Sequence, residues 1–328
     1  LWKTVQLSAL DIDMAVEKAR SSRLSMISAV KQAFFSYLLA KDSYVVLKRN
    51  YNNVALNTKT VTDKYEQGMA SEFDKLRAEV ELKNQRPNLL AAETAIELAS
   101  MQLKALMGLD IEYPVIFEGT LTQFEEEVTP EGMLPARAYS LEKNSDLAQL
   151  SIQKEQLELA LKLTKASFLP TLSLSSNYQY SSMNNNFKFS EYHWFPYSTA
   201  SLALSIPIFS GFKRQQQVRQ RNLNLQSLED SRINSERNLR LSVKNCLNEM
   251  SNAVEELASN KENVIMAEKA YSISQKQFEV GMGTWLDLSA SELALTQARL
   301  AYHQSIYRYL FNMAELEKIL GINNNQNN

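Results

Sequence analysis

Residues 278–287 of this chain read FEVGMGTWLD, a glycine-containing turn between two long stretches that lack both glycine and proline. A related turn, YEQGMASEFD, occupies residues 65–74, so that Gly281 follows Gly68 by 213 positions. The same spacing relates further identical residues: Asp74 and Asp287, Glu79 and Glu292, Leu82 and Leu295, Leu103 and Leu316, Gly108 and Gly321. This period is too long for a solenoid repeat, and we interpret it as the duplication of a half-protein.

A seam of mostly apolar residues precedes each turn, with members at alternating steps of four and three. Before the first turn the seam consists of Ala33, Tyr37, Ala40, Tyr44, Leu47, Tyr51, Val54, Thr58, Val61 and Tyr65. Before the second it consists of Cys246, Met250, Ala253, Leu257, Asn260, Val264, Ala267, Tyr271, Ser274 and Phe278. This spacing predicts a coiled coil written twice, with an ordinary core helix as the alternative.

The composition favours long elements and excludes several classes of protein. Only 8 Gly and 7 Pro occur in 328 residues, and with 45% hydrophobic and 22% charged residues the chain is neither disordered nor a polytopic helical membrane protein. No window offers the roughly 18 consecutive apolar residues of a membrane helix, so membrane contact would need strands or an attached lipid. The net charge of −2 gives no general reason to bind nucleic acid. A local basic run is interpreted as a solvated face: Lys213, Arg214, Arg219 and Arg221.

The order of elements predicts two helical hairpins separated by a different kind of structure. Long helices are expected at about 4–65 and 213–278, each returning after its glycine turn as a helix that ends before Gly108 or Gly321. Pro87 is expected to kink or break the first return helix. The predicted segments are 1–108 (first hairpin), 109–135 (equatorial linker with a short strand), 136–170 (helix from about Ala136), 171–211 (β-hairpin), 212–321 (second hairpin) and 322–328 (disordered tail).

Residues 171–181 and 197–209 alternate between apolar and small polar side chains, and each run is long enough for a transmembrane β-strand. The loop between them is followed by aromatic residues suited to a membrane interface: Tyr192, Trp194, Phe195 and Tyr197. The alternative is a soluble amphipathic hairpin with one core face. Because a lone hairpin would leave its edges unpaired in lipid, the membrane interpretation requires other hairpins to close the sheet.

In this order the parts resemble the TolC-like outer membrane efflux channels. The resemblance covers nearly the whole chain and rests on the paired turns, on the sequences SDL at residues 145–147 and SFLPTLSL at 167–174, and on LSIPIFSG at 204–211. It also rests on the helix endings LMGL at 106–109 and ILGI at 319–322. The resemblance implies a mainly α fold of antiparallel coiled-coil hairpins, joined to a β-hairpin that contributes to a trimeric transmembrane β-barrel.

The resemblance also implies a location and partners. A homotrimer would lie in the outer membrane of a Gram-negative bacterium, with a tunnel crossing the periplasm. Its turns would dock a periplasmic adaptor (membrane fusion protein) that is bound to an inner-membrane pump. The implied adaptor contacts are Gly68, Met69, Ser71, Gly281, Met282 and Thr284. For each glycine, the alternative is a residue needed only to turn the chain.

A periplasmic gate is implied at Asp74 and Asp287, where threefold symmetry would gather like charges around the lumen. The alternative is that both carboxylates only favour the first turn of their helices. The chain departs from the family's pattern at Phe278, Gly283 and Ala290, which stand in place of a tyrosine, an arginine and a second aspartate. The familiar network of closing bonds is therefore not expected here.

Three functions compete. The first is a passive exit duct of a tripartite efflux or type I secretion system, and the second is a periplasmic coiled-coil adaptor or scaffold without a pore. The third, an enzyme, is disfavoured because the chain has only His193 and His303 and lacks a phosphate loop, a nucleophile elbow or a metal-ligand cluster. No cofactor and no metal are expected.

The 213-residue spacing also concerns the start of the chain. It places Leu1 opposite Arg214, so the first copy lacks the helix and strand pair that residues 134–211 supply to the second. We therefore expect the native polypeptide to begin about a hundred residues earlier.

Overall fold

The computed structural model describes residues 2–130, 139–185 and 187–322. Its elements are α1 (Trp2–Glu66), α2 (Glu72–Leu106), η1 (Leu121–Glu127), α4 (Ser145–Ala166), β1 (Thr171–Ser181), η3 (Phe189–Glu191), β2 (Phe195–Ser205), α5 (Lys213–Glu279) and α6 (Trp285–Leu320). They divide between two compact units, one formed by residues 1–16 and 149–234 and the other by residues 17–148 and 235–328.

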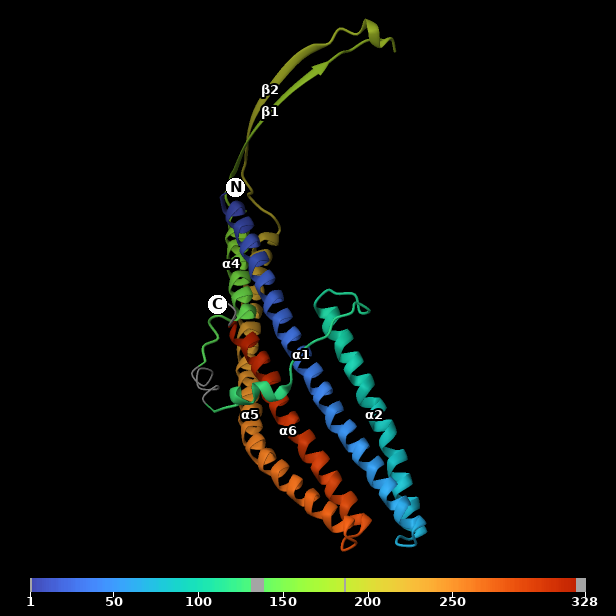
Figure 1. Ribbon diagram of the computed structural model, residues 1–328. Helices are drawn as coiled ribbons and strands as arrows, with labels where there is room; N and C mark the ends of the chain where they lie inside the picture. The colour runs from blue at the N-terminus through green and yellow to red at the C-terminus, as the bar shows by residue number, and fades with distance from the viewer. Residues whose placement is uncertain (1, 131–138, 186, 323–328) are drawn as a thin grey trace. The chain divides into compact units, whose positions relative to one another are not determined.

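The larger unit holds two antiparallel helical hairpins, α1 with α2 and α5 with α6, whose turns lie at the same end (Figure 1). The duplication is also seen in the backbone hydrogen bonds of the two turns. Met69 N donates to Lys64 O at 2.8 Å in the first turn, and Met282 N donates to Gln277 O at 2.8 Å in the second. All four residues obey the 213-position spacing, so the predicted repeat is confirmed as a repeat of backbone geometry.

The two predicted seams are the inner faces of these hairpins. Every one of their twenty residues is buried or half-buried. In α5 most of the residues between the seam positions are exposed, whereas in α1 most of them are also buried or half-buried. Met250 and Ala253 are 1% and 0% exposed in α5, and Val54 and Val61 are 4% and 1% exposed in α1. Burial of the seam therefore supplies the stability that helices of this length could not obtain from backbone hydrogen bonds alone.

The centre of the larger unit is an apolar core contributed by α1, α5, α6 and η1. Leu38, Leu121 and Tyr309 are fully buried there, and each buried leucine side chain stabilises the fold by about 1.5–3 kcal/mol. The backbone N–H of Leu121 donates to buried Asp42 at 2.8 Å, which fixes the start of η1 against α1. Hydrogen bonds from Lys261 and Tyr302 fix its other end and hold the pKa of Glu125 below its usual range.

The linker differs from the expectation. The predicted short strand is absent from the described residues 109–130, where η1 is the only regular element. The next helix was predicted from Ala136, which lies outside the described residues, as does the predicted disordered tail at 323–328. Residues 139–144 are not helical, and α4 begins at Ser145.

The start of α4 is fixed by Asn144, whose side chain bonds two elements at once. Its Oδ1 accepts from Leu147 N at 3.0 Å, as a helix cap does, while its Nδ2 donates to Ile319 O at 2.7 Å. The end of α6 is thereby joined to the start of α4, and the polar triplet at residues 144–146 is explained as a helix start.

Of the kink or break expected at Pro87, the break does not occur: α2 continues from Glu72 to Leu106 with Pro87 inside it. Proline removes one N–H and leaves the carbonyl four residues earlier, that of Lys83, without its helical donor. Both residues are exposed, so water can satisfy this carbonyl without breaking the helix.

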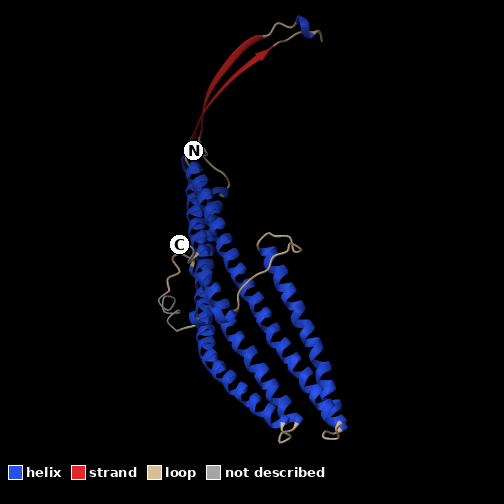
Figure 2. Ribbon diagram, in the orientation of Figure 1, coloured by secondary structure: helices blue, strands red, loops and turns tan. Residues whose placement is uncertain are grey.

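The smaller unit contains the ends of the long helices with α4, together with the antiparallel hairpin β1–β2 (Figure 2). The strands pair from Thr171 with Ser205 to Ser181 with Phe195. This register places the apolar residues of both strands on one face, with Leu172 opposite Leu204 and Leu174 opposite Leu202. The first strand has the predicted bounds, whereas the second begins and ends earlier than predicted, since Pro207 has no N–H for the ladder.

All the leucines of the apolar face are exposed, Leu174 to 77% and Leu202 to 69%. Within the described residues, no helix is both long and apolar enough to cross a membrane.

The two glycines that end the return helices make a matched pair for testing this fold. Gly108 and Gly321 both have positive φ, of 72° and 66°, but a Cβ at Gly108 would meet open space whereas one at Gly321 would overlap the carbonyl of Lys143. We expect Gly108→Ala to cost about 1–2 kcal/mol, the ordinary cost of this conformation, and Gly321→Ala to cost more. Thermal unfolding of the detergent-solubilised protein, followed by circular dichroism, measures the difference. Equal losses would contradict the close joint between α6 and α4.

Candidate functional site

The candidate site comprises the two turns, residues 66–72 and 279–285. Gly68 and Gly281 adopt φ values of 74° and 77°, a backbone conformation that glycine adopts without strain. No atom lies within 4 Å of the position that a Cβ would take at either residue. The neighbouring methionines are exposed, Met69 to 66% and Met282 to 80%. Each turn therefore presents open backbone beside one flexible apolar side chain.

The residues that follow each turn cap the returning helix. Ser71 Oγ accepts from Asp74 N at 3.1 Å, and Thr284 Oγ1 accepts from Asp287 N at 3.2 Å. Each carboxylate in turn accepts from the capping hydroxyl at 2.6 Å. Asp74 and Asp287 thus stabilise the first turns of α2 and α6, as the alternative interpretation of these residues predicted, and their role in a gate remains a prediction.

Gly283 explains one departure from the family pattern. Its N–H donates to Gln277 O at 3.0 Å, closing the second turn more tightly than the first. A Cβ at this position would lie 3.1 Å from Gln277 Cβ and 3.2 Å from Phe278 N. The backbone of α5 therefore leaves little room for a larger residue at position 283.

A compact apolar cluster lies directly behind the turns and joins the two hairpins. It consists of Val61, Ala78, Phe278, Trp285 and Leu288, with Tyr271 packed against it. The rings of Phe278 and Trp285 meet edge to face at a centroid distance of 6.1 Å. Phe278, which stands where the family pattern has a tyrosine, is 8% exposed. Its ring therefore contributes apolar packing at a position where a tyrosine would offer a hydroxyl group.

Lys64, in α1 of the first hairpin, contacts the end of α5 in the second hairpin. The sequence did not predict this contact. Its Nζ donates to the carbonyl of Phe278 at 2.5 Å and lies 4.3 Å from the centroid of the same ring. The contact joins α1 to the last turn of α5, where helix carbonyls lack intrahelical partners and favour a cation. No spacing rule pairs residues 214 positions apart, so only the tertiary structure could show this contact.

His303, one of the two histidines of the chain, packs inside the helical unit. His303 lies half-buried with its Nδ1 3.7 Å from Asp42 Oδ2, and burial lowers the pKa of its imidazole, which favours the neutral form. Burial likewise raises the pKa of Cys246 to about 11 and keeps the thiol protonated. Among the described residues, no group of three or more metal-binding side chains comes together.

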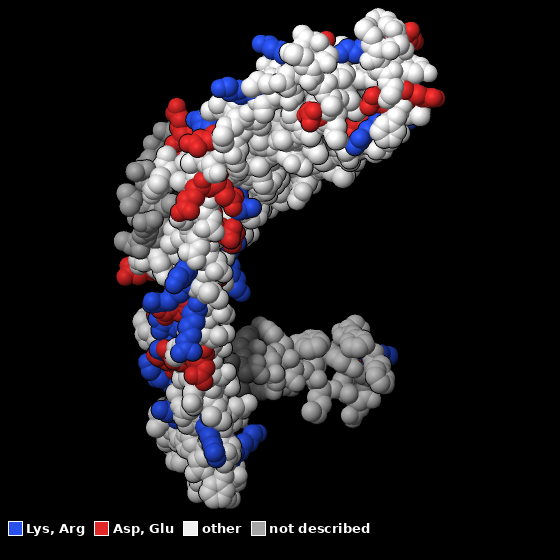
Figure 3. Space-filling view, turned by 90° about the horizontal axis from the view of Figure 1, so that it is seen from below, with Lys and Arg blue, Asp and Glu red and all other residues white. Residues whose placement is uncertain are grey.

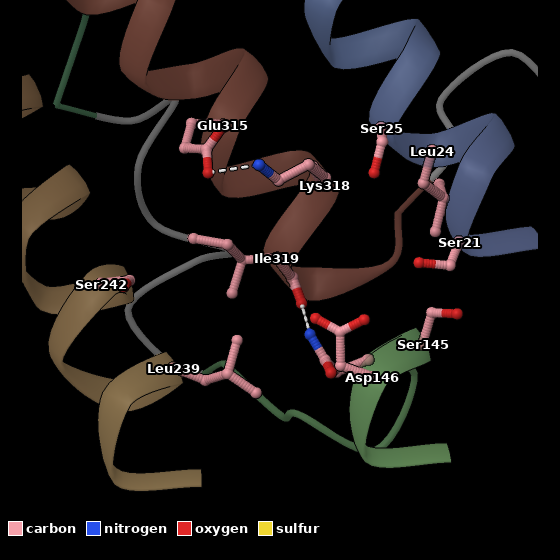
Figure 4. A pocket seen from close by; sticks show the side chains of 11 residues that line it. Ser21, Leu24, Ser25, Ser145, Asp146, Leu239, Ser242, Glu315, Lys318 and Ile319 are labelled. Atoms are coloured by element: carbon pink, nitrogen blue, oxygen red, sulfur yellow. Dashed lines mark hydrogen bonds and ion pairs between the residues drawn. The ribbon is translucent and has the colours of Figure 1, made fainter. Parts of the chain in front are cut away.

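A cavity of about 260 Å³ lies where α4 begins and α6 ends (Figure 4). Its polar wall is formed by Ser145 and Asp146 from α4 and by the Glu315–Lys318 ion pair of α6. Asn144 also lines the cavity, and its Nδ2 donates to Ile319 O at 2.7 Å. Residues of α1 and α5 complete the lining, so the cavity lies among four helices at the start of α4.

The aromatic residues predicted for a membrane interface gather at the closed end of the β-hairpin. Trp194, Phe195 and Tyr197 are 58%, 54% and 43% exposed, and the ring of Tyr192 lies 6.4 Å from that of Trp194. Away from the hairpin, on the face shown in Figure 3, basic and acidic side chains are interspersed and form no field of one sign.

Two helical hairpins that return at exposed glycine turns, joined through further helices to an amphipathic β-hairpin, define a protein of the channel-tunnel class. Comparison with known proteins supports this class. The model of the family described as outer membrane efflux protein matches residues 4–109 and 138–322. The chain belongs to this family. It is an efflux duct of the outer membrane of a Gram-negative bacterium, with a tunnel in the periplasm, and β1–β2 is its contribution to the barrel.

The relatives are distant in sequence and close in fold. The chain is 20% identical to the outer membrane protein TolC of Vibrio cholerae over 325 residues, covering 96% of this chain and 73% of that protein. It is 19% identical to TolC of Escherichia coli K12 over 345 residues, covering 99% and 67%.

Two solved structures share the fold. VceC of Vibrio cholerae superposes with a TM-score of 0.79 at 15% identity, covering 97% of this chain and 75% of that one. The open state of the Neisseria gonorrhoeae MtrE channel gives 0.80 at 16%, covering 98% and 71%. The competing interpretation, an adaptor or scaffold without a pore, finds no support in these comparisons.

Lys64 and Lys75 allow the fastening of the hairpins to be tested. Lys75 also lies over a ring, at 5.0 Å from the centroid of Tyr65, but within one hairpin. We expect Lys64→Met to remove about 1–2 kcal/mol of cation–π and hydrogen-bond energy and to speed amide hydrogen exchange in residues 276–285 roughly tenfold. Lys75→Met should leave exchange in that segment unchanged. An equal effect of the two substitutions would contradict a fastening role specific to Lys64.

Proposed function

We propose that three copies of the native protein close one barrel and one tunnel, and that the tunnel docks a periplasmic adaptor and its inner-membrane pump through both turns. The duct supplies no chemical step, since the pump provides the energy. The observation that carries this proposal is the repetition of one exposed turn geometry at Gly68 and Gly281, with a methionine beside each. Two equivalent turns per chain offer an adaptor repeated docking sites of one kind.

Association of the chain with further copies is supported by surfaces that one copy leaves uncovered. Among the residues that the structure describes, β1 and β2 form a two-stranded sheet, so no third strand pairs with either outer edge there. In lipid those groups must be paired, which requires neighbouring hairpins. Large apolar residues are also exposed on the helices at Phe73, Leu76, Val80, Leu241, Ile265 and Ile273.

Docking at the turns would use backbone and methionine more than hydroxyl groups. Ser71 and Thr284 already accept and donate hydrogen bonds in their caps, whereas Gly68 and Gly281 leave space for another backbone to approach. The unbranched, polarisable methionine side chain adapts to the shape of a partner. The predicted contacts therefore divide by role: Gly68, Gly281, Met69 and Met282 would meet the adaptor, and Ser71 and Thr284 would hold the turn in shape.

The double substitution Met69→Asp and Met282→Asp tests this docking. Because a carboxylate would be desolvated in an apolar contact, we expect efflux and co-purification of the adaptor to fall at least tenfold while the trimer still reaches the outer membrane. Met107→Asp is the control, since Met107 is 51% exposed at the opposite end of α2. Full efflux by the double variant would contradict docking through the turns.

A gate at Asp74 and Asp287 is the second part of the proposal. Three copies would bring six carboxylates to the same end of the tunnel, because both residues lie in the first turn after an exposed bend. Such a ring would attract cations into the constriction.

Conductance in planar bilayers distinguishes gating from capping. We expect a trivalent cation to block the native channel, and the Asp74→Asn and Asp287→Asn double variant to require a roughly tenfold higher concentration for the same block, about 1.4 kcal/mol. Ser71→Ala and Thr284→Ala, which remove the caps but keep the carboxylates, are the control. Unchanged block in the double variant would assign both aspartates to capping alone.

A further inference from the structure

Glu292 is a buried carboxylate at the contact between the two hairpins. It lies two turns into α6, one turn beyond Leu288 of the apolar cluster, and is only 3% exposed. Its Oε2 accepts a hydrogen bond from Asn57 Nδ2 of α1 at 3.1 Å. Among the described residues, its buried Oε1 meets no donor in hydrogen-bond geometry, although the amide of Asn53 lies near enough to favour the negative charge. A carboxylate with one oxygen unsatisfied is costly to bury when ionised, and neither the duct nor the docking turns require it.

The groups around Glu292 come from every helix of the two hairpins, and none is a cation. Asn53 and Asn57 approach from α1, Glu81 from α2 and Tyr271 from α5. Arg49 and Glu279 act on Tyr271 and not on Glu292. In the described part of the chain, Glu292 forms no ion pair with a lysine or arginine. Protonation is therefore the simplest way for this site to become neutral.

Burial is the main cause that raises the pKa of Glu292 to about 7. The negative charge of Glu81 raises it as well, whereas the amides of Asn53 and Asn57 favour the ionised form and lower it. The carboxyl group of Glu292 therefore lies at the contact between the two hairpins and changes its charge near neutral pH.

We propose that Glu292 is a proton-binding site that fastens α6 to α1 when protonated and loosens the contact when ionised, so that the two hairpins separate more readily as the pH rises. The inference rests on the channel function, because separation of the hairpins matters only if they enclose a passage. The protonated acid carries no charge, so its burial at this contact costs much less free energy than burial of the carboxylate.

The direction of the pH dependence follows from the two values of the pKa. In separated hairpins the exposed carboxyl returns to its ordinary value of 4.5, whereas in the fastened state its pKa is about 7. The fastened state binds the proton more tightly, so its advantage is full below pH 4.5, declines as the pH rises, and is lost above about 7. Each unit between the two pKa values changes the separation equilibrium about tenfold.

The duplication supplies a matched control. Glu79 occupies the position of Glu292 in the first copy, on α2, but is only half-buried. A substitution at Glu79 removes the same charge at the same depth of the repeat without touching the contact with Asn57.

The experiment records the open fraction of the full-length native trimer in planar bilayers between pH 4.5 and 8. We expect the native channel to open at least tenfold more often at pH 7.5 than at pH 5, Glu292→Gln to stay at the low level throughout, and Glu79→Gln to keep the native step. Asn57→Ala removes the donor that favours the ionised form, so it should move the midpoint of the step to higher pH, a shift that simple loosening of the contact would not produce.

The possible outcomes distinguish failure of the proton site at Glu292 from failure of the channel function. A native channel without a step, a step retained by Glu292→Gln, or equal loss in Glu79→Gln would each overturn the proton site while leaving the duct intact. An unshifted midpoint in Asn57→Ala would overturn it as well, even if Glu292→Gln failed to assemble. A native trimer that conducts at no pH would overturn the channel function and the proton site together.

Discussion

Side-chain burial between antiparallel helices is the constraint on which the rest of this structure depends. Helices as long as α1 and α5 are stable in water only if one face is covered, and the seams at four-and-three spacing cover it. The glycine turns are the points where the chain can reverse so that its partner helix returns along the seam. Exposed turns at one end are thus a consequence of the packing, and they become available for recognition for the same reason.

The duplication makes two similar hairpins but does not make their environments equal. The turn geometry is the same in both copies, whereas the contact between the hairpins places Lys64 of α1 against Phe278 of α5 and Asn57 of α1 against Glu292 of α6. Apolar packing and two polar contacts occupy the region where the family resemblance implied a different bonding network.

Much of the fold could be predicted because it is governed by local rules. Seam spacing, the glycine ends of the helices and the alternation in β1 identify their elements, and the structure confirms them. The predictions were wrong where contacts between residues far apart in the chain determine the local structure. No strand forms in the described residues 109–130, where the hydrogen bond from Leu121 N–H to Asp42 instead fixes the start of η1, and the bond from Asn144 to Ile319 shows why α4 begins at Ser145. Pro87 does not break α2, because at this exposed position water can satisfy the carbonyl that lacks its helical donor.

The amino-acid sequence by itself determined the duplication, the hairpins, the exposed turns and the amphipathic ribbon, since each follows from the period of apolar residues and from where glycine stands. The tertiary structure alone decided which side chains meet across the hairpins: the position of Lys64 at the end of α5 and the burial of Glu292 against Asn57. The physical reason is distance along the chain. Periodicity shows which face of a helix is covered, but the register between helices shows what covers it.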